Sequence, residues 1–136
     1  MSIIAFETNK SFSQSATTTT SSATGLIQFI PDTAKKLGTS VDKLSKMSAL
    51  KQLDFVEAYF NDYSTKLGKD PSLTDTYLAV LAPHAIGKSE KFIVYMKGTE
   101  AYKANDWLDN NNDGISRAEI SSYISKWYDK GQLFRK

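Results

Sequence analysis

Acidic and amide side chains gather in one segment near the C-terminal end of the chain, and their spacing is typical of a calcium-binding loop. An EF-hand loop places oxygen ligands at alternating positions and a glycine at the sixth position, where the chain turns sharply. Asp109, Asn111 and Asp113 occupy the first, third and fifth positions. Gly114 stands at the sixth, and the carbonyl of Ile115 would serve the seventh.

The same segment departs from the full pattern after its glycine. Glu119 stands at the eleventh position, one residue early, and Ser116 replaces the apolar residue expected at the eighth. We therefore predict a structural calcium site that binds more weakly than a full loop, with Glu119 as its closing ligand. The alternative is an Asn-rich turn that precedes a helix capped at Ser116.

Glu7 is the second group that could do chemistry, because the apolar run Ile3 to Phe6 precedes it. Burial favours the neutral form of a carboxyl group and so raises its pKa. A carboxylic acid that keeps its proton near neutral pH can act as a general acid. The alternative for Glu7 is an ordinary solvated glutamate at the end of a helix.

The elements that must position these residues are mainly helical. Apolar spacing, caps and glycine or proline stops predict helices over residues 2–9, 31–37, 48–67, 73–81 and 116–130. The strongest pattern is a continuous apolar stripe, three and four residues apart, formed by Leu53, Val56, Phe60, Tyr63 and Leu67. Residues 92–97 fit a helix or a strand equally well, and the Ser/Thr-rich residues 10–24 predict a solvated surface loop.

Composition limits the class of protein. With 136 residues, of which 40% are hydrophobic, the chain can build one modest core, so we predict a single domain over residues 1–136. A formal charge of +2 is too small to indicate a nucleic-acid partner, and no apolar run is long enough to insert into a membrane. The sequence contains no cysteine, which excludes disulfides, thiolate zinc sites and cysteine nucleophiles.

A family resemblance emerges from six blocks that occur in order along most of the chain. They are Ala5-Phe6-Glu7-Thr8, Ala23-Thr24-Gly25-Leu26-Ile27-Gln28-Phe29-Ile30-Pro31, Ala34-Lys35-Lys36-Leu37-Gly38, Gln52-Leu53-Asp54-Phe55-Val56-Glu57, Ala79-Val80-Leu81-Ala82-Pro83-His84-Ala85-Ile86-Gly87-Lys88 and Gly98-Thr99-Glu100-Ala101-Tyr102. Together they resemble the lytic transglycosylase branch of the lysozyme-like superfamily, and its phage-associated members in particular. In that family a Glu-Ser or Glu-Thr pair ends a helix, and a Gly-Leu-Met-Gln motif follows one loop later.

The resemblance implies a mainly α, lysozyme-like domain with the calcium loop of residues 109–119 inside it. It implies cleavage of the β-1,4 bond between MurNAc and GlcNAc in peptidoglycan, with Glu7 as general acid and then general base. Substrate contacts are expected from Thr8, Ile27 and Gln28, where Ile27 replaces the family's methionine. The carboxamide of Gln28 could hydrogen-bond the N-acetyl and hydroxyl groups of an amino sugar. Phe29 is expected in the core.

One family motif is altered. Where related enzymes carry Ala-Tyr-Asn-Ala-Gly, this chain has Pro83-His84-Ala85-Ile86-Gly87, so that His84 falls on the tyrosine. His84 is therefore a candidate for polarising Glu7 or for binding sugar. Tyr102 matches the family better and is a further candidate for substrate binding.

Three functions are consistent with these residues: a lytic transglycosylase, a hydrolytic muramidase, and an inactive peptidoglycan-binding or calcium-dependent structural module. A hydrolase normally needs a second carboxylate, and residues 10–24 contain no aspartate. Asp32, Asp54 and Glu57 are the remaining candidates, and the last two are expected to be solvated. The pattern therefore favours transglycosylation.

The expected setting follows from the same resemblance. The partner is peptidoglycan, in the bacterial cell wall and periplasm, and catalysis needs no cofactor. Because no secretory signal is visible, we expect delivery by a phage particle or a lysis system. The domain is expected to be a monomer, either alone or as part of a phage particle or larger assembly.

Overall fold

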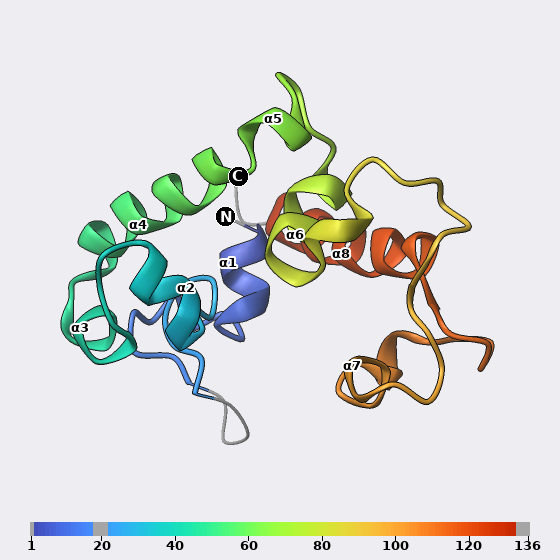
Figure 1. Ribbon diagram of the computed structural model, residues 1–136, viewed down its shortest axis with the longest axis horizontal. Helices are drawn as coiled ribbons and strands as arrows, with labels where there is room; N and C mark the ends of the chain where they lie inside the picture. The colour runs from blue at the N-terminus through green and yellow to red at the C-terminus, as the bar shows by residue number, and fades with distance from the viewer. Residues whose placement is uncertain (1, 18–21, 133–136) are drawn as a thin grey trace. The chain divides into compact units, whose positions relative to one another are not determined.

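The computed structural model describes residues 2–17 and 22–132, and it confirms that the chain is mainly helical. The chain divides into two compact units, Met1–Tyr63 and Ser64–Lys136, which are described separately (Figure 1). The central part of the predicted Ser/Thr-rich loop, residues 18–21, lies outside the described residues. None of the described helices has the length and apolar character needed to cross a membrane.

The first unit contains four of the described helices, coloured blue to green in Figure 1. They are α1 (Ser2–Glu7), α2 (Pro31–Lys36), α3 (Val41–Lys46) and α4 (Ala49–Asp62). Side-chain oxygens start two of them, because Ser40 accepts from the Lys43 N–H and Ser48 accepts from the Lys51 N–H. The sequence pattern missed α3, whose six residues are too few to show a clear apolar period.

The helix predicted over residues 48–67 is interrupted, so this prediction is wrong in its extent. At Tyr63 the N–H bonds to the Phe60 carbonyl at 3.0 Å, which tightens the last turn and ends α4. The next helix, α5 (Ser64–Leu67), already belongs to the second unit. An unbroken apolar pattern therefore did not require an unbroken helix.

The core of the first unit also corrects the predicted stripe. Leu53 is 40% exposed, whereas its neighbour Gln52 is completely buried. The inner face of α4 is instead formed by Gln52, Val56 and Tyr59, which are spaced four and three residues apart. The other buried apolar residues of this unit are Ile3, Ile4, Ala23, Leu26, Ile27, Phe29, Ala34 and Leu44. Phe29 is thus in the core, as predicted.

The second unit combines helices with a two-stranded sheet. Its elements after α5 are α6 (Leu73–Leu81), η1 (Pro83–Ala85), β1 (Ile93–Tyr95), α7 (Glu100–Lys103), η2 (Asp106–Leu108), β2 (Ile115–Ser116) and α8 (Arg117–Gln132). β1 and β2 pair antiparallel, with Ile93 opposite Ser116 and Tyr95 opposite Ile115. Residues 92–97, ambiguous in sequence, therefore contribute a strand. Ser116 ends β2 and also caps α8, because its Oγ accepts from the Glu119 N–H at 3.3 Å, so the predicted helix cap at Ser116 is confirmed.

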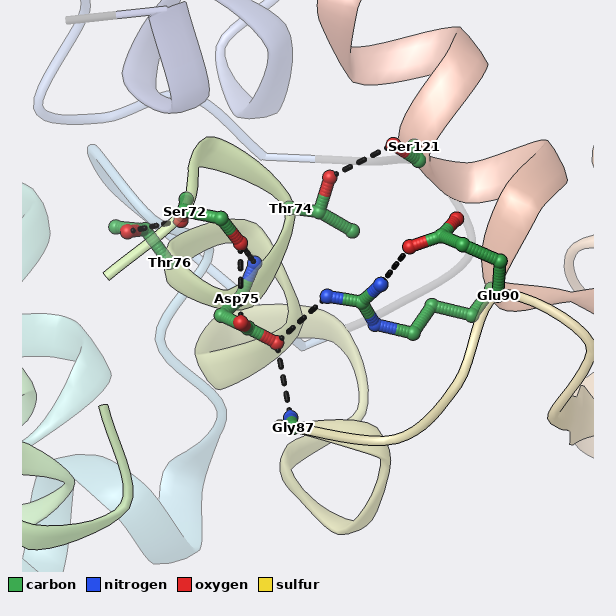
Figure 2. A network of polar contacts seen from close by, with 8 residues as sticks. Ser72, Thr74, Asp75, Thr76, Gly87, Glu90 and Ser121 are labelled. Atoms are coloured by element: carbon green, nitrogen blue, oxygen red, sulfur yellow. Dashed lines mark hydrogen bonds and ion pairs between the residues drawn. The ribbon is translucent and has the colours of Figure 1, made fainter. Parts of the chain in front are cut away.

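A buried arginine ties α6 to α8 in the second unit (Figure 2). Arg117 is 7% exposed; its guanidinium bonds Asp75 at 3.0 Å and also contacts Glu90. Asp75 accepts a further hydrogen bond from the Gly87 N–H at 3.0 Å. Desolvation alone would raise the pKa of Asp75, but these hydrogen bonds and the charge of Arg117 outweigh it and lower the pKa. Close by, Thr74 donates to Ser121 at 2.9 Å.

Candidate active site

Glu7 is the last residue of α1, and the helix places it beside the core. Ile3 and Ile4 are both 8% exposed, and Glu7 itself is half-buried. Burial raises the pKa of the Glu7 carboxyl group to about 7. The carboxyl group therefore holds its proton up to near-neutral pH, as the apolar sequence before it predicted.

No charged group among the described residues accounts for the raised pKa of Glu7. Among the described residues it forms no hydrogen bond or salt bridge, and burial is the cause of its raised pKa. A second carboxylate close by would raise the pKa further, and none contributes within the described part of the chain. Asp32, Asp54 and Glu57, the sequence candidates for such a partner, are all exposed.

The chain that follows Glu7, residues 8–16, has strained backbone and is here called the strained loop. Asn9, Lys10 and Phe12 have φ angles of 47°, 67° and 51°, in the left-handed region that non-glycine residues rarely adopt. Such strain costs free energy, persists only where the surroundings enforce it, and clusters at functional sites. Asn9 and Lys10 close the end of α1, where left-handed residues are common, and the Lys10 N–H bonds back to the Ala5 carbonyl. Phe12 lies beyond that helix end, and its strain marks the chain after Glu7 as a candidate site.

Thr8 holds the start of this strained loop. It is 4% exposed, and its hydroxyl donates to the Ile4 carbonyl at 2.7 Å and accepts from the Phe12 N–H at 3.0 Å. The structure thus places Thr8 in the framework of the loop. Its role in substrate binding stays a prediction.

The turn of residues 25–28, here called the glycine turn, is the second part of the site. Gly25 has a φ of +86° and Gln28 a φ of +53°. Thr24 and Phe29 close the turn by exchanging two backbone hydrogen bonds of 3.1 and 2.8 Å. Ile27 is 3% exposed and belongs to the core, so any contribution it makes to a cleft stays a prediction.

The carboxamide of Gln28 is turned toward the strained loop. Its Nε2 donates to the carbonyls of Ala16 and Gly25, both at 3.0 Å. Its Oε1 is buried and has no hydrogen-bond partner among the described residues. The amide hydrogens of Gln28 are thus used within the protein, and Oε1 is the polar atom of this side chain that the described residues leave unpaired. The role of Gln28 in substrate binding stays a prediction.

Sequence reasoning missed Tyr59, which connects the two parts of the site. Its ring packs edge-on against Phe29, with 6.4 Å between ring centroids, and its side chain hydrogen-bonds Tyr63. Burial is the largest cause of its raised pKa, and the charge of Glu7 adds to the rise. Tyr59 therefore lies within electrostatic range of Glu7 while contacting the residue that follows Gln28. Its spacing from the buried Gln52 and Val56 was the available signal.

His84 and Tyr102 belong to the second unit, so their predicted roles beside Glu7 stay predictions. His84 is exposed; its Nε2 lies 3.2 Å from the Val94 carbonyl, and its ring packs edge-on against Phe92 and Tyr95. Tyr102 donates its hydroxyl hydrogen to Asp109 Oδ2 at 2.9 Å, which raises the pKa of Tyr102. The structure thus joins Tyr102 to the predicted calcium loop.

Hydrogen bonds to Asp109 close the first half of that loop. Its Oδ1 accepts from the backbone N–H groups of Asn111 and Asn112 at 3.1 and 2.6 Å, and its Oδ2 accepts from that of Gly114 at 3.0 Å. Desolvation alone would raise the pKa of Asp109, but these bonds and that from Tyr102 lower it. The carboxylate stays ionised, as a calcium ligand must.

Glu119 closes the second half. Its Oε1 accepts from the Asn110 N–H at 2.7 Å, and its Oε2 accepts from both the N–H and the hydroxyl of Ser116 at 2.8 Å. Asn111 and Asp113 are exposed, and Ile115 is buried in the sheet. Within the described residues, no group of three or more acidic, histidine or cysteine side chains is gathered as a metal site. The calcium site stays a prediction.

Comparison of the chain with protein-family models, with curated proteins and with solved structures gives no match. The chemistry of the site therefore has to be argued from its own residues.

Proposed function

We propose that this protein is a peptidoglycan lytic transglycosylase, which cleaves the β-1,4 bond between MurNAc and GlcNAc with Glu7 as its acid and base. The observation that carries the proposal is the state of Glu7. Its half-buried carboxyl group has a pKa of about 7 and ends a helix that leads into strained backbone. The order of sequence blocks around Glu7 and the glycine turn supports the family.

In the proposed reaction the protonated Glu7 gives its proton to the glycosidic oxygen, and the GlcNAc side leaves as an alcohol. The resulting carboxylate then takes the proton of the C6 hydroxyl of the same MurNAc residue. That oxygen attacks C1 and closes a 1,6-anhydro ring. Glu7 ends the cycle protonated, so that water is not consumed. Gln28 Oε1 is proposed to accept a hydrogen bond from the N-acetyl N–H of the bound strand.

Two features favour this route over hydrolysis. Hydrolytic glycosidases pair their acid with a second carboxylate, and the described residues supply none that acts on Glu7. The sequence candidates for that partner, Asp32, Asp54 and Glu57, are exposed to solvent. An internal hydroxyl nucleophile needs only one residue that alternates between acid and base.

The proposal extends to the whole chain and its setting. Residues 1–136 are treated as one lysozyme-like muralytic domain that acts on the cell wall and is delivered by a phage particle or a lysis system. Calcium at the Asp109–Glu119 loop is proposed as a structural ion, with oxygen ligands of the kind that calcium prefers.

The test is digestion of purified sacculi, followed by mass spectrometry of the products. We expect anhydro-ended muropeptides from the wild type and almost none from Glu7→Gln, because glutamine has the shape of glutamate but cannot deliver a proton. Products with reducing ends would replace transglycosylation by hydrolysis. Equal digestion by the two proteins would refute the role of Glu7.

A further inference from the structure

The carboxamide of Gln52 is completely buried, and each of its polar atoms is used. Its Oε1 accepts from the Leu26 N–H at 3.0 Å. Its Nε2 donates to the carbonyls of Gln14 and Leu44, both at 2.6 Å. One side chain of α4 thus joins the glycine turn, the strained loop after Glu7 and the end of α3.

Gly25 fits directly against this carboxamide. A Cβ atom at position 25 would lie 2.4 Å from Gln52 Oε1, closer than such atoms approach, and the φ of +86° also favours glycine. The Gly25 N–H donates to the Ala16 carbonyl at 2.9 Å, the same carbonyl that Gln28 Nε2 contacts. Gln52 and Gln28 therefore hold the same loop segment, residues 14–16, from two positions.

Gln28 needs this support because its backbone is strained. A non-glycine residue at a φ of +53° relaxes unless its neighbours hold it. Besides the Thr24–Phe29 backbone pair that closes the turn, the neighbours that hold it are the residue 14–16 segment and Gln52, through Leu26. Loss of the Gln52 carboxamide would remove the contact that fixes the turn to α4.

We propose that Gln52 is a positioning residue for substrate binding, which holds the glycine turn so that Gln28 can receive the glycan strand. The inference rests on the proposed function and deepens it by separating binding from proton transfer. Gln52 contacts the turn, the loop and α3 through hydrogen bonds, whereas Glu7 acts through its own buried carboxyl group. Gln52 should therefore govern KM, and Glu7 should govern kcat.

The experiment measures steady-state cleavage of soluble glycan fragments by the full chain, well below the melting temperature of each variant. Gln52→Met keeps the length of the side chain and removes all three hydrogen bonds. We expect KM to rise about three- to tenfold, because a displaced Gln28 would lose one hydrogen bond to the glycan strand. The value of kcat should stay within about twofold of the wild type. The alkaline limb of the kcat–pH profile, which reports Glu7, should not move.

Two further variants make the result specific. Gly25→Ala pushes the carboxamide away while leaving Gln52 in place, and should raise KM in the same way. Thr74→Val removes a partly buried hydrogen bond in the second unit, so it should lower the melting temperature and leave KM unchanged. A KM effect of Thr74→Val equal to that of Gln52→Met would assign the effect to general destabilisation.

The outcomes separate this inference from the proposed function. Absence of turnover by the wild type overturns the proposed function and the inference with it. Wild-type turnover with an unchanged KM in folded Gln52→Met overturns the inference alone. If neither Gln52→Met nor Gly25→Ala gives a cooperative melting transition, Gln52 supports the whole fold, and the specific role is overturned.

Discussion

Glu7 has a consequence for stability that does not depend on any substrate. Its pKa is raised from 4.5 to about 7 in the folded chain, so folding disfavours its charged form. The folded state therefore loses stability as the pH rises from the unfolded to the folded pKa, and the loss is complete above the folded pKa. At about 1.4 kcal/mol per pKa unit, the ionised carboxyl group destabilises the fold by about 2–3 kcal/mol at alkaline pH.

Replacing Glu7 by glutamine should therefore stabilise the protein, although the proposed reaction requires that it abolish activity. We expect Glu7→Gln to melt at a higher temperature than the wild type at pH 8, and at a similar temperature at pH 4. Denaturation curves at both values measure the difference. The exposed Glu57→Gln is the control and should show no such pH dependence. A constant difference between Glu7→Gln and the wild type would contradict the raised pKa.

Single residues were predictable from the sequence where their environment depends on neighbours in the chain, and unpredictable where it depends on residues far away in the chain. The apolar run before Glu7 predicted a raised pKa, because Ile3 and Ile4 of the same short helix are buried with it. Gln52 was missed because its partners are distant: Gln14 lies 38 positions away, and Leu26 lies 26. A buried glutamine between a lysine and a leucine has no local sequence signature, so only the fold reveals it.

At the scale of elements, the packing of α6 on α8 depends on one buried cation. Arg117 faces Asp75 and Glu90, and removing it would leave both carboxylates without their cationic partner (Figure 2). We expect Arg117→Met to lower the free energy of unfolding by about 2–4 kcal/mol at neutral pH. Lys103→Met is the control: it breaks an exposed pair with Glu100 and should cost less than about 1 kcal/mol.

The contribution of the Asp75–Arg117 pair to stability changes with pH in the opposite direction to that of Glu7. The folded pKa of Asp75 lies below its ordinary value of 3.8, so its contribution is present above that value. It is lost as the pH falls through the lowered folded value. The stability difference between the wild type and Arg117→Met should therefore shrink in acid. Urea titrations at pH 7 and pH 3 measure this, and an equal difference at both would contradict the role of Asp75.

Element boundaries followed the hydrogen bonds of single residues, and this explains which were predictable. Pro31 begins α2, as the sequence predicted. Tyr63 ends α4 by a backbone hydrogen bond, which no pattern of side chains predicts. The helix α3 is too short for its apolar residues to show a helical period. The strand Ile93–Tyr95 exists because it pairs with Ile115 and Ser116, which lie about twenty residues further along the chain.

At the scale of the whole molecule, the division into two units lets the calcium prediction name the unit that the ion should stabilise. The Asp109–Glu119 loop follows η2, contains β2 and ends in the first turn of α8, so bound calcium would stabilise the second unit directly. An ion that binds only the folded state adds about 2.7 kcal/mol at a hundredfold excess over its Kd, which should raise Tm by several degrees. Scanning calorimetry with millimolar calcium, compared with chelator, measures the shift and the number of transitions.

If the chain 1–136 unfolds as one domain, calcium should move a single transition that includes both units. If the units melt separately, only the transition of the second unit should move. Asp109→Ala should abolish the shift, whereas Asp32→Ala, which alters an exposed acid of the first unit, should keep it. Catalysis requires no metal in the proposed reaction, so chelator should lower Tm without lowering kcat at low temperature. Identical curves with calcium and with chelator would show that residues 109–119 form only an Asn-rich turn.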